Sequence, residues 1–207
     1  MGKELTFERL AEWSEQMHEN RADMVAANAS VENGFAEAAA DYRALQKLPY
    51  SFSIDLKNQG KMTDQKVSGR CWLFSALNTF HYEMINRFNL DDFELSQNYL
   101  FFYDKLERAN FYLENMIALA DEPLTSRLFC FLNAEPMGDG GQWDMMANLV
   151  RKYGVVPKEI YPDSANSIRS RNFNPYLTSL LREDAAALRK AHEAGKSDEE
   201  LRGIKQE

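Results

Sequence analysis

Residues 64–75 of this chain read Asp64-Gln65-Lys66-Val67-Ser68-Gly69-Arg70-Cys71-Trp72-Leu73-Phe74-Ser75. The first half of this stretch is polar and includes a glycine, which is typical of a loop. The second half begins an apolar run that continues with helical spacing to Phe88. We therefore predict a loop over residues 58–70, followed by a helix from Cys71 to about Phe88. Because this helix is apolar nearly all round, we expect it to be buried.

Cys71 falls in the first turn of the predicted helix. Unpaired N–H groups and the helix dipole stabilise negative charge at a helix N-terminus, and the thiolate is the nucleophilic form of cysteine. Arg70 adds a neighbouring positive charge, and the Gln65 amide can donate to an oxyanion beside the Cys71 N–H. The pattern indicates a nucleophile with an oxyanion-stabilising group. Placement alone also allows a small buried cysteine and a solvent-exposed loop amide.

The second cysteine, Cys130, lies in the apolar run 127–132, and we expect it to pack in the core. Two cysteines do not form a disulfide scaffold, which favours a reducing cytoplasm. The three histidines and two distant cysteines of the chain cannot build a metal cluster, so we expect no metal and no cofactor.

The N-terminal quarter of the sequence is predicted to be helical. Residues 5–48 show helical spacing of apolar residues, with an interruption at Asn33-Gly34 and a stop at Pro49. Apolar and polar residues then alternate over residues 50–54, which predicts a short strand.

Further helices are predicted in the second half of the sequence. One covers residues 95–117 with Ser96 as its N-cap, and another covers residues 142–153 after a turn-rich segment. From about residue 177 the chain becomes helical and charged, with few large apolar residues.

The composition excludes several classes of protein. The chain has 207 residues, of which 44% are hydrophobic, so disorder of the whole chain is excluded. Its net charge is −8 at pH 7, and phosphate binding needs a basic face, so we expect no nucleic-acid partner. The sequence has neither a long apolar run nor the apolar segment of a secretory signal, so we expect no membrane association.

Three segments occur in order along the chain: Gly69-Arg70-Cys71-Trp72, Leu95-Ser96-Gln97 and Gly138-Asp139-Gly140-Gly141. They resemble, in turn, the active-site cysteine motif, a helix opening with Leu-Ser, and the double-glycine substrate loop of papain-like cysteine peptidases. The resemblance is greatest to the bleomycin hydrolase and aminopeptidase C branch. It covers about residues 25–165 with matching order and spacing.

The resemblance implies roles for four residues. Cys71 takes the position of the nucleophile, and Gln65 takes that of the oxyanion hole. Gly140 and Gly141 take the positions where the main chain runs beside an extended peptide substrate, which glycine allows because the backbone can approach closely. Taken alone, the two glycines also fit a plain turn.

Secreted papain relatives carry a disulfide at the positions that Ser68 and Gly138 occupy here. The joint absence of these cysteines agrees with a reducing compartment. Near these positions, Trp72 and Trp143 are expected to pack rather than to bind substrate.

The resemblance further implies an α+β, papain-like fold, of which this chain holds mostly the helical lobe. We expect an N-terminal helical wrap over residues 1–48. The helical lobe with the nucleophile and the double-glycine loop follows over residues 49–165, and a truncated helical insertion over residues 166–207. For the complete protein, the resemblance implies a homohexamer.

A papain-like thiol needs a histidine as base and acid, and an asparagine that orients this histidine. His18 lies in the N-terminal helical run, and His192 lies on a charged helical surface. His81 follows Cys71 by ten residues in the same helix, about 15 Å away at 1.5 Å per residue. The resemblance places the required pair beyond Glu207, so we expect the isolated chain to be catalytically incomplete.

Two classes of function follow. The first is a cytoplasmic cysteine aminopeptidase that hydrolyses peptides through a thiolate nucleophile. The alternative is a non-catalytic truncated or split subunit that acts as a binding or assembly half. A helical lobe without its partner lobe exposes apolar surface, which favours association with another chain.

Overall fold

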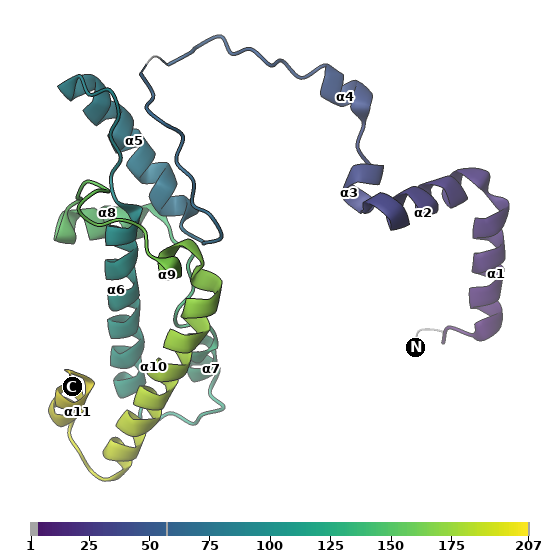
Figure 1. Ribbon diagram of the computed structural model, residues 1–207. Helices are drawn as coiled ribbons and strands as arrows, with labels where there is room; N and C mark the ends of the chain where they lie inside the picture. The colour runs from purple at the N-terminus through teal and green to yellow at the C-terminus, as the bar shows by residue number, and fades with distance from the viewer. Residues whose placement is uncertain (1–3, 57, 207) are drawn as a thin grey trace. The chain divides into compact units, whose positions relative to one another are not determined.

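The computed structural model describes residues 4–56 and 58–206 (Figure 1). Every regular element among these residues is a helix, and their strand-like pairing is one isolated antiparallel bridge between Leu95 and Pro157. The expected α+β class is therefore wrong for this part of the chain, whereas its mostly helical character is confirmed. The strand predicted over residues 50–54 is also wrong, because no described strand pairs with this alternating segment and its apolar side chains stay exposed.

The chain divides into two units. The first, residues 4–55, contains α1 (Phe7–Glu19), α2 (Arg21–Asn33), α3 (Phe35–Ala38) and α4 (Tyr42–Gln46). Side-chain oxygens of Thr6, Asn20 and Asp41 accept main-chain hydrogen bonds at the starts of α1, α2 and α4. The predicted break after α2 is confirmed, and Gly34 takes a positive φ of 86° there. None of the described residues of this unit is buried.

The second unit spans residues 56–206. Its described helices are α5 (Cys71–Phe88), α6 (Gln97–Ala118), α7 (Arg127–Ala134), α8 (Trp143–Tyr153), α9 (Ala165–Ile168), α10 (Ser170–Glu193) and α11 (Asp198–Gln206). The Ser96 hydroxyl caps α6, as predicted, by accepting a hydrogen bond from the N–H of Tyr99 (3.0 Å). Helix α10 begins at Ser170, before the predicted residue 177, and it contains Pro175.

Helix α5 has the predicted bounds but not the predicted burial. Leu73, Leu77 and Ile85 are buried on one of its faces, whereas Phe88 at its end is 60% exposed. The buried apolar residues of α5 therefore pack against α6 and α8 on one face of the helix. The helix is not buried all round.

Helix α6 connects two apolar clusters, and Figure 1 shows it at the centre of this unit with α10 alongside. One cluster joins α5, α6 and α8 through Leu73, Leu77, Leu100, Phe101 and Met146. The other joins α6, α7, α10 and α11 through Tyr112, Met116, Phe129, Leu188 and Leu201. None of the helices described is both long and apolar enough to cross a membrane.

Cys130 is exposed, so the prediction that it packs in the core is wrong. Helix α7 has eight residues and buries Phe129, while the neighbouring Cys130 faces away from the cluster. Because successive residues of a helix point about 100° apart, a continuous apolar run does not reveal which of its members is buried.

Candidate active site

Cys71 is the first residue of α5, and its free thiol is exposed. The main-chain oxygen of Arg70 accepts hydrogen bonds from the N–H groups of Leu73 (2.9 Å) and Phe74 (3.0 Å), which closes the first turn. The N–H of Cys71 has no hydrogen-bond partner within the described part of the chain. Cys71 is therefore not a core residue, and its N–H is free to bind an oxyanion.

Arg70, the residue before Cys71, is fully buried. Its Nη1 donates to Asp163 Oδ1 (2.6 Å) and its Nε to Ser68 Oγ (2.9 Å). The guanidinium also lies 5.2 Å from the ring centre of Phe74 and 5.7 Å from that of Phe101. The expected positive charge beside the thiol is thus paired and enclosed, and it anchors the start of α5 instead of facing solvent.

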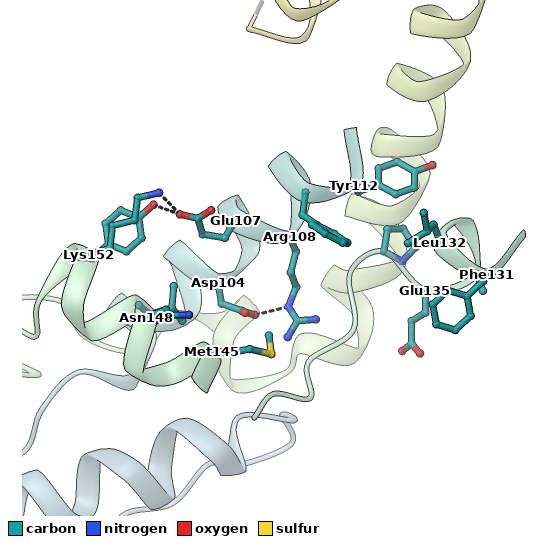
Figure 2. A pocket seen from close by; sticks show the side chains of 15 residues that line it. Asp104, Glu107, Arg108, Tyr112, Phe131, Leu132, Glu135, Met145, Asn148 and Lys152 are labelled. Carbon is teal, nitrogen blue, oxygen red and sulfur yellow. Dashed lines mark hydrogen bonds and ion pairs between the residues drawn. The ribbon is translucent and has the colours of Figure 1, made fainter. Parts of the chain in front are cut away.

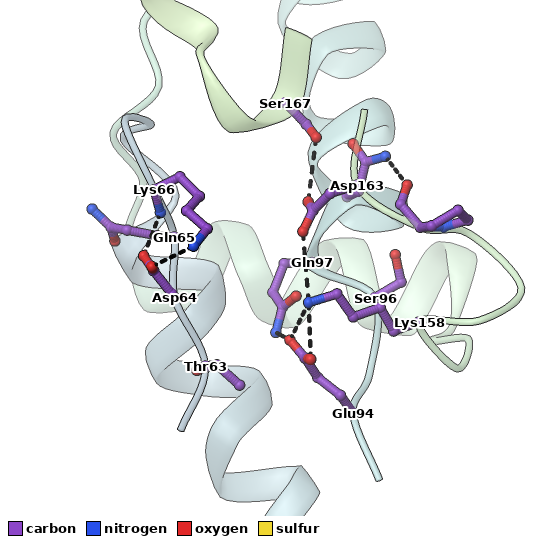
Figure 3. Close-up of polar contacts among 12 residues, drawn as sticks. Thr63, Asp64, Gln65, Lys66, Glu94, Ser96, Gln97, Lys158, Asp163 and Ser167 are labelled. Atoms are coloured by element: carbon purple, nitrogen blue, oxygen red, sulfur yellow. Dashed lines mark hydrogen bonds and ion pairs between the residues drawn. The ribbon is translucent and has the colours of Figure 1, made fainter. Parts of the chain in front are cut away.

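Gln65 lies in the loop that leads to α5, and its Nε2 donates to the main-chain oxygen of Ser68 (3.0 Å). The Ser68 hydroxyl donates back to the main-chain oxygen of Gln65 (2.7 Å), so the two residues close a turn. Figure 3 shows the Gln65 amide turned away from the neighbouring ion pair of Asp64 and Lys66. Because an amide has two N–H donors, one remains for another acceptor.

Gly140 and Gly141 lie in the loop before α8, and their surroundings differ. A Cβ atom on Gly140 would meet no atom within 4 Å, whereas one on Gly141 would lie 2.4 Å from the Trp72 indole. The Trp72 Nε1 also donates to the main-chain oxygen of Asp139 (2.8 Å). Trp72, the residue after Cys71, therefore packs under the double-glycine loop, as expected. Trp143 is the first residue of α8 and is 63% exposed, so the prediction that it packs is wrong.

The Asp139 carboxylate joins this loop to the cysteine loop. Its Oδ2 accepts a hydrogen bond from the N–H of Gly69 (3.1 Å), and a Cβ on Gly69 would lie 2.4 Å from that of Asp139. This contact joins the residues that follow Ser68 and Gly138 in the chain. Burial raises the pKa of Asp139, but hydrogen bonds from Lys105, Ser170 and others outweigh it and lower the pKa to about 2.

The structure thus places Cys71 at the start of α5 and the other predicted residues on two loops that meet there. The sequence pattern assigns no role to Asp139 or to Lys105. The run 104–108 of α6 carries four charges, a pattern typical of a solvated face, yet Lys105 is buried. One sequence feature indicates a contact of Lys105 with an apolar residue, because Lys105 follows Phe101 by one helical turn. In the structure, the Lys105 Nζ lies 4.8 Å from the Phe101 ring centre.

None of the histidines hydrogen-bonds to Cys71 in the described part of the chain. His18 contacts the main-chain oxygen of Ser14, and His192 contacts Asp121 Oδ1 (2.8 Å). His81 is buried in α5, where burial lowers its pKa below the usual value. Among the described residues, no group of three His, Cys, Asp or Glu side chains could hold a metal ion.

Comparison with known proteins shows similarity over the whole chain. The Peptidase C1-like family matches residues 4–207. Aminopeptidase C of Lactobacillus delbrueckii subsp. lactis is 44% identical over 207 residues, which are all of this chain and 46% of that protein. Cysteine proteinase 1, mitochondrial, of Saccharomyces cerevisiae is 48% identical over 141 residues, covering 68% of this chain and 29% of the yeast protein.

A solved structure shows the same arrangement of helices. The crystal structure of PepW from Lactobacillus rhamnosis matches with a TM-score of 0.91 and 40% identity, covering 100% of this chain and 46% of that one. The chain therefore spans about half the length of these bacterial relatives.

Proposed function

Because the chain belongs to the Peptidase C1-like family, we propose that it forms the nucleophile-bearing half of a cysteine aminopeptidase active site. It is homologous to aminopeptidase C cysteine peptidases over about 46% of their length. Peptides are the proposed substrates, and peptide-bond hydrolysis is the proposed reaction of the complete site.

In this proposal, the Cys71 sulfur attacks the scissile carbonyl carbon and forms a bond to it. The N–H of Cys71 and the spare N–H of Gln65 stabilise the resulting oxyanion. A histidine from outside these 207 residues protonates the leaving amine, and water then hydrolyses the thioester. The chain alone is therefore expected to react once with an electrophile but not to turn over substrate.

Gly141 is the proposed binding position for the peptide main chain. Its N–H and carbonyl oxygen have no hydrogen-bond partner among the residues described, whereas the Gly140 carbonyl is already bonded to Arg108. An extended peptide can pair with these free groups as a strand pairs with a sheet edge.

A single observation carries the proposal: Trp72 supports Gly141 and directly follows the exposed thiol of Cys71. A nucleophile and a peptide-binding main chain are thereby held at one helix start. Cys130 has no comparable loop beside it, and it offers an internal control because its thiol is also free and exposed.

The proposal is tested by labelling the chain with a dipeptidyl vinyl sulfone and following each cysteine by mass spectrometry. We expect labelling of Cys71 to saturate with reagent concentration and to slow when an unreactive dipeptide amide is added. The labelling rate of Cys130 should rise linearly with reagent concentration and should not change when the dipeptide amide is added. Linear labelling at both cysteines with similar rates would contradict the proposal, as would catalytic hydrolysis by the chain alone that survives Cys71→Ala.

A role as an assembly half is the second candidate, and exposed apolar side chains favour it. Phe7, Tyr50 and Phe52 in residues 4–55 are each more than 85% exposed, and no described residue of this segment is buried, so its apolar side chains form no core of their own. We propose that this segment associates with another chain in a homo-oligomer, a hexamer by the family resemblance. The two free cysteines support a reducing, cytoplasmic location.

A further inference from the structure

We propose that Asp139 and Arg108 are positioning residues that hold the double-glycine loop in place and so determine how well the site binds a peptide main chain. The inference rests on the proposed function, because it concerns the same loop. Neither residue needs to touch the substrate.

The Asp139 carboxylate is held by donors from three parts of the fold. Lys105 of α6 (2.8 Å) and Asn174 of α10 (2.5 Å) donate to its Oδ1. Ser170 of α10 and the N–H of Gly69 donate to its Oδ2. A carboxylate with so many donors has little freedom to move, and it precedes Gly140 directly.

Lys105 contributes more than a counter-charge. Its ammonium has three donors, and these reach the main-chain oxygens of Met137 (3.2 Å) and Gly138 (3.1 Å) as well as Asp139. The side chains of Lys105 and Asp139 are only 7% and 14% exposed. The loop from residue 137 to residue 139 is therefore tied to the centre of α6 by a buried ion pair.

Arg108 holds the next residue of the loop. Its Nη2 donates to the main-chain oxygen of Gly140 (2.5 Å), and its Nε donates to the buried Asp104 (2.8 Å). Arg108 and Asp104 lie at the wall of a pocket of about 920 Å³ that residues of α6, α7 and α8 line. Figure 2 shows the hydrogen bond between the two side chains. The Gly140 carbonyl oxygen is therefore bonded to Arg108, whereas the N–H and carbonyl oxygen of Gly141 are available to a peptide.

These contacts support the loop from beneath, while Trp72 supports Gly141 from the start of α5. Asp139 also reaches Gly69, two residues before the nucleophile. The spacing between Cys71 and Gly141 is thereby set by groups on α6, α10 and the two loops. Loss of one of them should weaken peptide binding without changing the intrinsic reactivity of Cys71.

The experiment compares two reagents on Asp139→Asn and Arg108→Lys in a Cys130→Ser background. A dipeptidyl vinyl sulfone depends on the loop, whereas iodoacetamide reports only the reactivity of the thiol. We expect Asp139→Asn to slow the peptidyl reagent about tenfold and to leave the iodoacetamide rate within about twofold. Arg108→Lys should act in the same direction, because an ammonium cannot reach both Asp104 and Gly140 as the guanidinium does.

The control is Asp121→Asn, which neutralises an exposed carboxylate paired with His192. It should change neither rate. Equal slowing of both reagents by Asp139→Asn would overturn the inference, since it would indicate general loosening of the fold. If Asp139→Asn does not fold, as judged by circular dichroism, an unchanged peptidyl rate in Arg108→Lys would overturn it. Unsaturable labelling of the unmodified chain would instead reject the proposed function.

Discussion

Cys71 and Cys130 are both free and exposed, yet they lie in very different surroundings. Cys71 begins α5 between two polar loops, and the residue after it supports Gly141. Cys130 is the fourth residue of α7, where its thiol donates a hydrogen bond to the main-chain oxygen of Leu124 (3.4 Å). Exposure therefore does not identify a reactive site, and the loops gathered around a thiol distinguish the two cysteines.

The largest effect is expected from a substitution that displaces the double-glycine loop from Cys71. Gly141→Ala would place a Cβ 2.4 Å from the Trp72 indole, so the loop or the ring must move. We expect a loss of up to about 3 kcal/mol in unfolding free energy, together with loss of saturable peptidyl labelling at Cys71. Urea denaturation and labelling kinetics measure the two effects.

Gly140→Ala is the matched control for that substitution, because its Cβ would meet no atom within 4 Å. It should change the unfolding free energy by less than about 0.5 kcal/mol. Equal destabilisation by the two substitutions would show that the contact between Trp72 and Gly141 does not hold the loop.

Lowering the pH should reduce the unfolding free energy gradually, and by less than Gly141→Ala does. The pKa of Asp139 is lowered from 3.8 to about 2, so its folded-state stabilisation is fully present above about pH 4 and is lost as the pH falls through about 2. The shift corresponds to about 2 kcal/mol at most. Urea unfolding of the chain and of Asp139→Asn should give free energies that converge between about pH 5 and about pH 2.5. A difference that stays constant over this range would contradict the account of the carboxylate.

Local sequence pattern was sufficient to predict the main features around Cys71. A glycine-containing polar stretch followed by an apolar run gave the correct start and end of α5, because both signals act within a few residues. The Ser96 cap of α6 was predicted for the same reason. The positions of Gln65, Gly140 and Gly141 on loops beside this helix also agree with the sequence interpretation, while their roles remain predictions.

Other features depend on contacts between distant segments, and the sequence pattern does not contain them. The ion pair of Lys105 and Asp139 joins residues 34 positions apart, and the charged run around Lys105 is typical of a solvated face. The exposure of Cys130 depends on which face α7 turns to the core. The alternation over residues 50–54 indicates a strand only where a partner strand exists, and none is described here.

Hydrogen exchange can show whether Cys71 and the double-glycine loop form one site. The chain is labelled at Cys71 with the dipeptidyl vinyl sulfone or, as a control, with iodoacetamide, and exchange of the peptide containing residues 138–143 is measured by mass spectrometry. We expect slower exchange at Gly141 in the dipeptidyl adduct only, because its N–H gains a hydrogen bond there. Unchanged exchange at Gly141 in the dipeptidyl adduct would contradict a single site.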